Sequence, residues 1–170
     1  MDQIPKIIAE LLNALHLEYQ LPQTEGQTET PRRVARFWKE YLVGATADPA
    51  KILKATFALG AYTGPVVVDG IQFASICEHH LLPFVGTATV AYLPSDRIVG
   101  LSKIPRLVDA LSRKPQTQEA LTEAIVRGMQ VLNPRGVRVE VTAEHMCMTM
   151  RGIQARGTTT TTRMAIGEPV

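Results

Sequence analysis

The pattern of hydrophobic and polar positions predicts helices in the first part of the chain. Hydrophobic residues between positions 4 and 15 recur at helical spacing, which indicates one amphipathic helix. The pair Thr30-Pro31 is typical of a helix start, and we expect this second helix to end near Gly44. Residues 48–62 predict a short helical turn and a loop. We therefore expect an N-terminal helical segment at residues 1–62.

From Gly64 onward, the hydrophobic pattern changes from helical spacing to alternation, which is typical of strands. The expected strands are 66–76, 85–93, 137–151 and 157–164. Two helices are expected between the second and third strands, one after Ser102 and one from Pro115 to Leu132. The prediction for residues 63–170 is an α+β fold, in which a four-stranded antiparallel sheet carries two inserted helices on one face. The exposed edges of such a sheet favour closure by oligomerisation.

Composition narrows the class of protein. A chain of 170 residues with 45% hydrophobic and 20% charged residues is long enough for one domain with a real core. Its net charge of +2 is too small to indicate nucleic-acid binding. No hydrophobic run reaches the ~18 residues of a membrane span, and the charged N-terminal pattern is unlike a secretory signal. We expect a soluble, cytoplasmic protein with reduced cysteines.

Two distant segments, Cys77-Glu78-His79-His80 and His145-Met146-Cys147, contain both cysteines and three of the four histidines. Cys77 and His80 are three apart, so one turn can direct both side chains at a single point. His145 and Cys147 are two apart in a predicted strand and would share a face. Two thiolates and one imidazole suit Zn²⁺ and leave a fourth position open, which is the pattern of catalytic zinc.

Two simpler explanations of the cysteines stay open. They could form a disulfide, although nothing in the sequence indicates an oxidising compartment. They could also be inert core residues, since free cysteine is often buried. The histidine neighbours of both cysteines favour a metal site.

A second group of residues indicates an anion site. Ser102 is a good N-cap, but Lys103 and Arg106 lie in the first helical turn, where the helix dipole disfavours cations. Free backbone N–H groups, a hydroxyl and two cations together suit a phosphate, although the charges could also extend into water. Arg151 would share the strand face of His145 and Cys147, which again points to an anionic substrate.

At these residues the chain resembles the GTP cyclohydrolase I family. Five motifs in order are similar to that family: Thr30-Pro-Arg-Arg-Val-Ala-Arg36, Cys77-Glu-His-His-Leu-Leu-Pro-Phe84, Gly100-Leu-Ser-Lys-Ile-Pro-Arg106, Pro115-Gln-Thr-Gln-Glu119 and His145-Met-Cys-Met-Thr-Met-Arg-Gly152. The resemblance implies the tunnelling fold (T-fold), in which the sheets of several subunits close into a barrel. It also implies a homo-oligomer, typically a decamer, with active sites between subunits.

The resemblance further implies an activity and a role for each motif residue. The activity is the hydrolysis of GTP to formate and 7,8-dihydroneopterin triphosphate, a first step of folate and pterin biosynthesis. The implied zinc ligands are Cys77, His80 and Cys147, and the implied acid–base pair is His79 and His145. Triphosphate binding falls to Ser102, Lys103, Arg106 and Arg151, assisted by Arg33 and Arg36. Guanine recognition falls to Gln118 and Glu119.

Some of these residues have ordinary explanations as well. Arg33 and Arg36 lie three apart and could form a solvated helix face, while an acidic residue such as Glu119 near a helix start is explained by the dipole. Two other functions also stay open. One is a related enzyme that stops at an opened formamidopyrimidine, and the other is a non-catalytic, zinc-stabilised oligomer or nucleotide-binding module.

Overall fold

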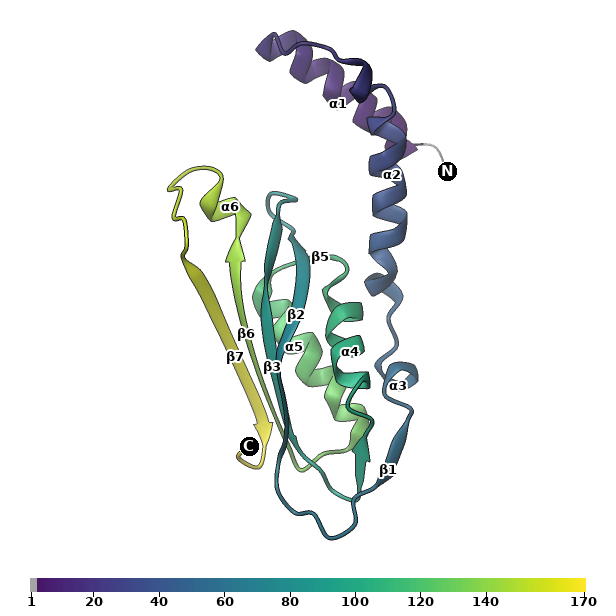
Figure 1. Ribbon diagram of the computed structural model, residues 1–170, viewed down its shortest axis with the longest axis vertical. Coiled ribbons are helices and arrows are strands. Elements are labelled where there is room, and N and C mark those ends of the chain that lie inside the picture. Colours follow the sequence, from purple (N-terminus) through teal and green to yellow (C-terminus); the bar gives the residue numbers. More distant parts are fainter. Residues whose placement is uncertain (1–2) are drawn as a thin grey trace. The chain divides into compact units, whose positions relative to one another are not determined.

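The chain forms two units, one ending at Val43 and one spanning Gly44–Val170, in a computed structural model that describes residues 3–170 (Figure 1). The first unit contains α1 (Gln3–Tyr19), the short 3-10 helix η1 (Glu25–Gln27) and α2 (Thr30–Tyr41). Both α-helices lie where the hydrophobic spacing predicts them. Thr30 is the first helical residue rather than the cap, which is Glu29.

The division between the units lies earlier in the chain than the predicted domain boundary at 62 and 63. Gly44 packs on the end of a helix of the second unit: its N–H donates to Arg113 O at 3.2 Å, and an added Cβ would lie 2.4 Å from Ala110 O. The short elements that follow, α3 (Pro49–Ile52) and β1 (Thr56–Ala58), pack with the second unit as well. The domain boundary itself stays a prediction.

The second unit is built on one five-stranded sheet with the order β5-β2-β3-β6-β7. Its members are β2 (Val66–Cys77), β3 (Pro83–Leu93), β5 (Pro115–Gln116), β6 (Gly136–His145) and β7 (Thr159–Gly167). The four long strands pair antiparallel, and the short β5 pairs parallel with the end of β2. This arrangement confirms a mixed α+β protein.

Two helices, α4 (Lys103–Ser112) and α5 (Gln118–Met129), cover one face of this sheet (Figure 1). Strand β6 shows why. Its buried side chains, such as Val139 and Val141, alternate with exposed or half-buried polar ones, such as Arg138 and Glu140. A strand with this alternation buries one face only, so the helices collect on the hydrophobic side. The core lies between that side and the inward faces of α4 and α5.

Several short elements were not predicted from the sequence. The strands β1 and β4 (Arg97–Val99) form a separate two-stranded sheet, and β5 has only two residues. The 3-10 helices η1, η2 (Leu42–Thr46) and η3 (Gln130–Leu132) were not predicted either. Pieces this short contain too few residues to show periodicity.

The predicted strand 137–151 is wrong at its C-terminal end. β6 ends at His145, and the next residues form the short helix α6 (Met146–Thr149). The alternation of methionine with other residues imitates a strand pattern, but the Met150 N–H donates to Met146 O at 3.0 Å, as in a helical turn. His145 and Cys147 therefore do not share a strand face.

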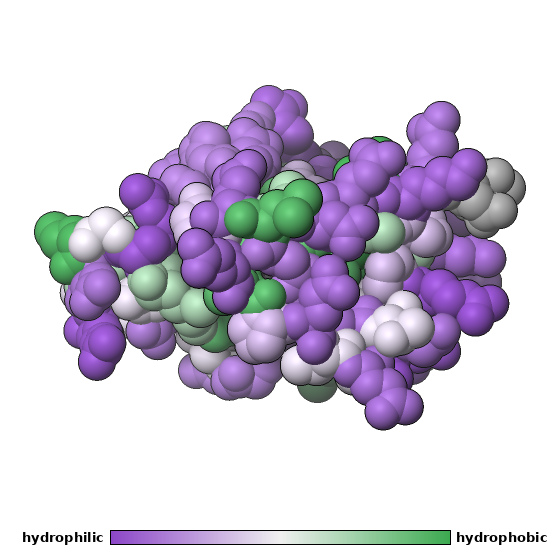
Figure 2. All heavy atoms as spheres, turned by 90° about the horizontal axis from the view of Figure 1, so that it is seen from above, coloured by the Kyte–Doolittle hydropathy of each residue, from purple (hydrophilic) through white to green (hydrophobic). Residues whose placement is uncertain are grey.

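Few hydrophobic side chains lie on the face of the molecule that Figure 2 shows. That view is largely hydrophilic, with a few separate hydrophobic groups. Within residues 3–170, none of the helices has both the length and the hydrophobicity needed to cross a membrane.

Candidate metal centre and active site

The end of β2 and the tight connection to β3 place the first cysteine and two histidines. Cys77 is the last residue of β2, and its N–H and C=O bond to Leu82 O and Leu81 N at 2.8 and 2.9 Å. Leu81 has a positive φ of 54°, so the chain reverses sharply there. Within this turn His79 and His80 are exposed, while Cys77 stays buried.

The three residues Cys77, His80 and Cys147 come together. One ligand atom from each lies within 4.8 Å of the others. In a tetrahedral site with Zn–S bonds of about 2.3 Å, two sulfurs lie roughly 3.8 Å apart, so this spacing fits a shared ion after a small contraction. Two sulfurs and an imidazole nitrogen also match the preference of zinc for soft and borderline ligands. The convergence expected from the sequence is present, although a helical turn and not a strand presents Cys147.

The electrostatics of the cysteine pair favour a cation. Burial raises the pKa of the Cys147 thiol, and the neighbouring Cys77 raises it further. Without a cation the Cys147 thiol therefore keeps its proton, which a metal would displace. His79 lies beside the pair, with its Nδ1 3.8 Å from Cys77 Sγ.

Arg151 also reaches this cluster. Its Nη1 donates to His80 Nε2 at 3.0 Å, although 71 residues separate the two in sequence. The predicted position of Arg151 beside the cysteine and histidine cluster is therefore found, even though β6 ends six residues earlier.

His145 lies next to the cluster and is held on two sides. Its ring stacks on Phe84, with centroids 4.7 Å apart and planes 3° from parallel. Its Nε2 lies 2.7 Å from Gln118 Oε1. Burial lowers the pKa of His145, which favours the neutral imidazole, and the charge of Glu119 opposes this shift.

Several of these residues line a cavity of about 220 Å³. Its walls are Cys77, His79, Gln116, Thr117, Gln118, Glu119, His145, Cys147, Met148 and Thr160. Thr117 caps α5 by accepting from Ala120 N at 3.1 Å, so Gln118 and Glu119 begin the helix at the cavity wall. Glu119 is exposed, and among residues 3–170 its carboxylate has no hydrogen-bond or ion-pair partner.

The predicted phosphate-binding residues of α4 lie away from this cavity. Only the far end of α4 approaches it, where Gln116 Nε2 donates to Leu111 O at 2.9 Å. A helix of 10 residues spans about 15 Å, so Lys103 and Arg106 begin α4 at its opposite end. Ser102 occupies the N-cap position without a side-chain capping bond, which leaves its hydroxyl exposed.

Arg33 and Arg36 belong to the first unit. With Glu29 and Arg32 they line a surface hollow on α2. Arg36 Nε also lies 4.0 Å from Glu40 Oε1. This exposed ion pair contributes little to stability.

Sequence reasoning missed several residues of the site, of which Phe84 and Gln116 are examples. Phe84 ends one motif and Gln116 lies inside another, but a phenylalanine in a strand and a glutamine before a helix have many ordinary roles. Only the stacking on His145 and the place of Gln116 in the cavity wall identify them.

The fold and site together define an α+β enzyme with a candidate metal centre at one end of its sheet. The chain belongs to the GTP cyclohydrolase I family, because the model of that family matches residues 4–169. It is 50% identical to GTP cyclohydrolase 1 of Brucella anthropi over 149 residues, which cover 86% of this chain and 70% of that relative. It is 45% identical to GTP cyclohydrolase 1 of Streptococcus thermophilus over 168 residues, covering 98% of this chain and 88% of the relative.

A solved structure supports the fold. The crystal structure of the archaeosine synthase QueF-Like in the apo form matches 64% of this chain and 99% of its own, with a TM-score of 0.53. Sequence identity is 15%, so this likeness concerns the fold alone.

Proposed function

We propose that this chain hydrolyses GTP at C8 of the guanine, releases formate and rearranges the product to 7,8-dihydroneopterin triphosphate. The observation that carries the proposal is the convergence of Cys77, His80 and Cys147 beside a cavity that also contains His145 and Glu119. Membership of the GTP cyclohydrolase I family supports the same reaction.

Cys77, His80 and Cys147 would hold Zn²⁺ through two sulfurs and one ring nitrogen. When bound, Zn²⁺ supplies a nucleophile near neutral pH, because it lowers the pKa of a bound water to about 7. Three protein ligands leave a coordination position for that water. The exposed side of the site, where His80 lies, keeps it open to solvent and substrate.

His79 and His145 would move the protons of ring opening. Their placement supports this role, because His79 lies against Cys77 and His145 lies in the cavity wall. The lowered pKa of His145 keeps its imidazole neutral and ready to accept a proton. Positioned groups of this kind typically contribute 100-fold or more to a rate.

Glu119 would recognise the guanine. Its unpaired carboxylate can accept from both N1–H and the 2-amino group, two donors that adenine lacks. Gln118 begins the same helix, but its side-chain amide is already bonded within the protein.

Arg151 and the first turn of α4 would bind the triphosphate. Because Ser102, Lys103 and Arg106 lie at the far end of α4 from the cavity, we propose that they serve the cavity of a neighbouring copy. This arrangement fits a homo-oligomer of the T-fold type, typically a decamer, with active sites between subunits. Arg33 and Arg36 would assist from α2.

The proposal is tested with zinc-loaded protein and GTP, by measuring formate release and identifying the product by mass spectrometry. We expect both formate and 7,8-dihydroneopterin triphosphate. In His145→Ala, zinc content should stay unchanged and formate release should fall by about 100-fold or more.

Other outcomes identify the alternatives. An opened formamidopyrimidine as the final product would indicate an enzyme that stops early on the same fold. Absence of turnover in the loaded protein, together with unfolding on chelation, would indicate a non-catalytic oligomer stabilised by zinc.

A further inference from the structure

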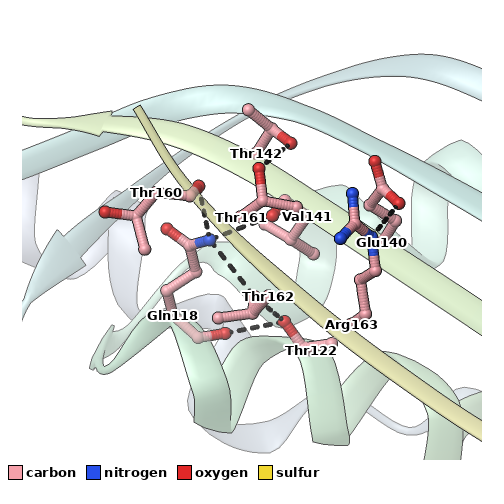
Figure 3. Close-up of polar contacts among 9 residues, drawn as sticks. All are labelled: Gln118, Thr122, Glu140, Val141, Thr142, Thr160, Thr161, Thr162 and Arg163. Atoms are coloured by element: carbon pink, nitrogen blue, oxygen red, sulfur yellow. Dashed lines mark hydrogen bonds and ion pairs between the residues drawn. The ribbon is translucent and has the colours of Figure 1, made fainter. Parts of the chain in front are cut away.

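Gln118 is a buried glutamine whose side-chain amide is completely engaged. Only 2% of its surface is exposed. Its Nε2 donates to Val141 O and Thr160 O, both at 3.0 Å, and to Thr162 Oγ1 at 3.1 Å (Figure 3). Three acceptors from β6 and β7 therefore surround the two N–H groups of one amide.

These acceptors determine the orientation of the Gln118 amide, that is, which groups its nitrogen and its oxygen face. Two of them are backbone carbonyl oxygens, which accept and never donate, so the nitrogen of Gln118 must face them. The amide oxygen then faces His145 Nε2 at 2.7 Å. Because this oxygen also accepts only, the hydrogen between them must belong to the histidine.

We propose that Gln118 is a positioning residue that holds His145 in the tautomer with hydrogen on Nε2. The other ring nitrogen, Nδ1, is then the one with a free lone pair. Phe84 fixes the plane of the ring by stacking, and Gln118 fixes its rotation in that plane. The catalytic consequence rests on the proposed function, whereas the tautomer does not.

A ring of hydrogen bonds keeps the Gln118 side chain in place. Thr122 Oγ1 lies 2.9 Å from the backbone oxygen of Gln118 and must donate to it. Thr162 Oγ1, 2.6 Å from Thr122 Oγ1, therefore donates to Thr122 and accepts from Gln118 Nε2. The ring runs from the Gln118 amide through both hydroxyls and back to the Gln118 backbone (Figure 3).

This ring gives the threonine-rich last strand a role in the site. Thr160 and Thr162 lie on β7, and each supplies an acceptor to Gln118. The same hydrogen bonds give different roles to two neighbouring residues of α5, Gln118 and Glu119. The side chain of Gln118 has no spare N–H for a substrate, so side-chain recognition of the guanine falls to Glu119.

The tautomer is measured directly in the zinc-loaded full-length protein. Solid-state ¹⁵N spectra of histidine-labelled protein at about pH 8, well above the ordinary imidazole pKa of about 6.5, distinguish protonated from unprotonated ring nitrogens. His145 is assigned by its disappearance in His145→Gln. We expect hydrogen on Nε2 and a bare Nδ1. Hydrogen on Nδ1 in the wild-type protein would overturn the proposal, whether or not GTP is turned over.

Two matched variants separate positioning from general loss of structure. Gln118→Met removes the acceptor at His145, whereas Gln116→Met removes another buried amide in the cavity wall that bonds Ser75 Oγ and Leu111 O instead. We expect mixed His145 tautomers only in Gln118→Met, with zinc content unchanged. Formate release in that variant should lose about 100-fold in kcat, with KM for GTP changed by less than about 3-fold.

The outcomes are distinct from those of the proposed function. If Gln118→Met keeps hydrogen on Nε2, or if Gln116→Met loses it equally, Gln118 does not set the tautomer. If the wild-type protein shows the expected tautomer but releases no formate, positioning stands and the proposed reaction fails. If Gln118→Met does not fold, the wild-type spectrum still decides the assignment.

Discussion

Arg151 donates a hydrogen bond to His80 Nε2 at 3.0 Å, which uses a lone pair that metal binding would remove. A metal on Nε2 takes this lone pair directly. A metal on Nδ1 leaves the neutral ring with its hydrogen on Nε2, which can then no longer accept. Either way, loading the metal releases the guanidinium of Arg151, so the metal and an anionic substrate should bind cooperatively.

This coupling predicts that zinc strengthens the binding of inorganic triphosphate partly through Arg151. Zinc also attracts the anion itself, so the informative quantity is the difference between wild type and Arg151→Ala. We expect the gain on zinc loading to be about 10-fold smaller in Arg151→Ala, the lower end for a charge-assisted hydrogen bond. Calorimetric titration with and without stoichiometric zinc measures it.

Arg156→Ala is the matched control, because Arg156 is an exposed arginine a few residues later in the same connection. It should show the wild-type gain on zinc loading. An identical gain in wild type and Arg151→Ala would show that Arg151 is not released for the anion.

Cys147 should determine both the retention of zinc and its dependence on pH. Cys147→Ser removes one sulfur ligand and should leave the purified protein without zinc, while His79→Gln should retain it. Because burial raises the pKa of the Cys147 thiol, zinc must displace its proton. The apparent affinity should therefore fall as pH is lowered, by about 10-fold per pH unit for each proton released.

Competition with a chelator at about pH 7 and pH 8 provides the measurement. An affinity that does not change between these values would mean that the Cys147 thiol is already ionised before zinc binds. Zinc retained at wild-type stoichiometry in Cys147→Ser would remove Cys147 from the ligand set.

The metal cluster was predictable from the sequence, but the path of the chain through it was not. Cys77 and His80 share one turn, so their spacing alone brings them together. Cys147 reaches the site through α6, where alternating methionines imitate a strand. The sequence also did not predict that Lys103 lies away from the cavity. It shows that a helix begins near Lys103, but not which end of this helix faces the site. The tautomer of His145 depends on backbone oxygens of two strands, which no sequence motif encodes.

Glu119 should determine the preference for guanine over bases that lack the 2-amino group. Glu119→Gln replaces a carboxylate that accepts twice with an amide that accepts once and presents N–H groups to guanine donors. We expect kcat/KM for GTP to fall by about 100-fold, as for two weakened charge-assisted hydrogen bonds. Inosine triphosphate lacks one of the donors and should lose less.

Glu123→Gln is the control, because Glu123 lies one turn along α5 and pairs with Arg127 at 2.6 Å instead of facing the cavity. It should leave both substrates almost unaffected. Equal losses for GTP and inosine triphosphate in Glu119→Gln would show that Glu119 does not contact the 2-amino group.

Tyr92 should make the fold sensitive to alkaline pH. Its side chain is 1% exposed, and its hydroxyl accepts from Val99 N at 3.1 Å, which ties β4 to β3. Burial raises the pKa of Tyr92 above its ordinary value of about 10, and the Val99 bond only partly opposes this. The unfolded chain therefore loses this proton at a lower pH than the folded chain, so stability is intact below about pH 10 and falls as pH rises through the folded pKa.

Tyr92→Phe should lower the free energy of unfolding at neutral pH by about 1–3 kcal/mol, because Val99 N–H loses its buried partner, but it should flatten the alkaline decline. Urea unfolding at about pH 7, 9 and 11 tests both effects, with Tyr62→Phe as the exposed control. Parallel alkaline declines in Tyr92→Phe and the wild-type protein would assign the sensitivity to other groups.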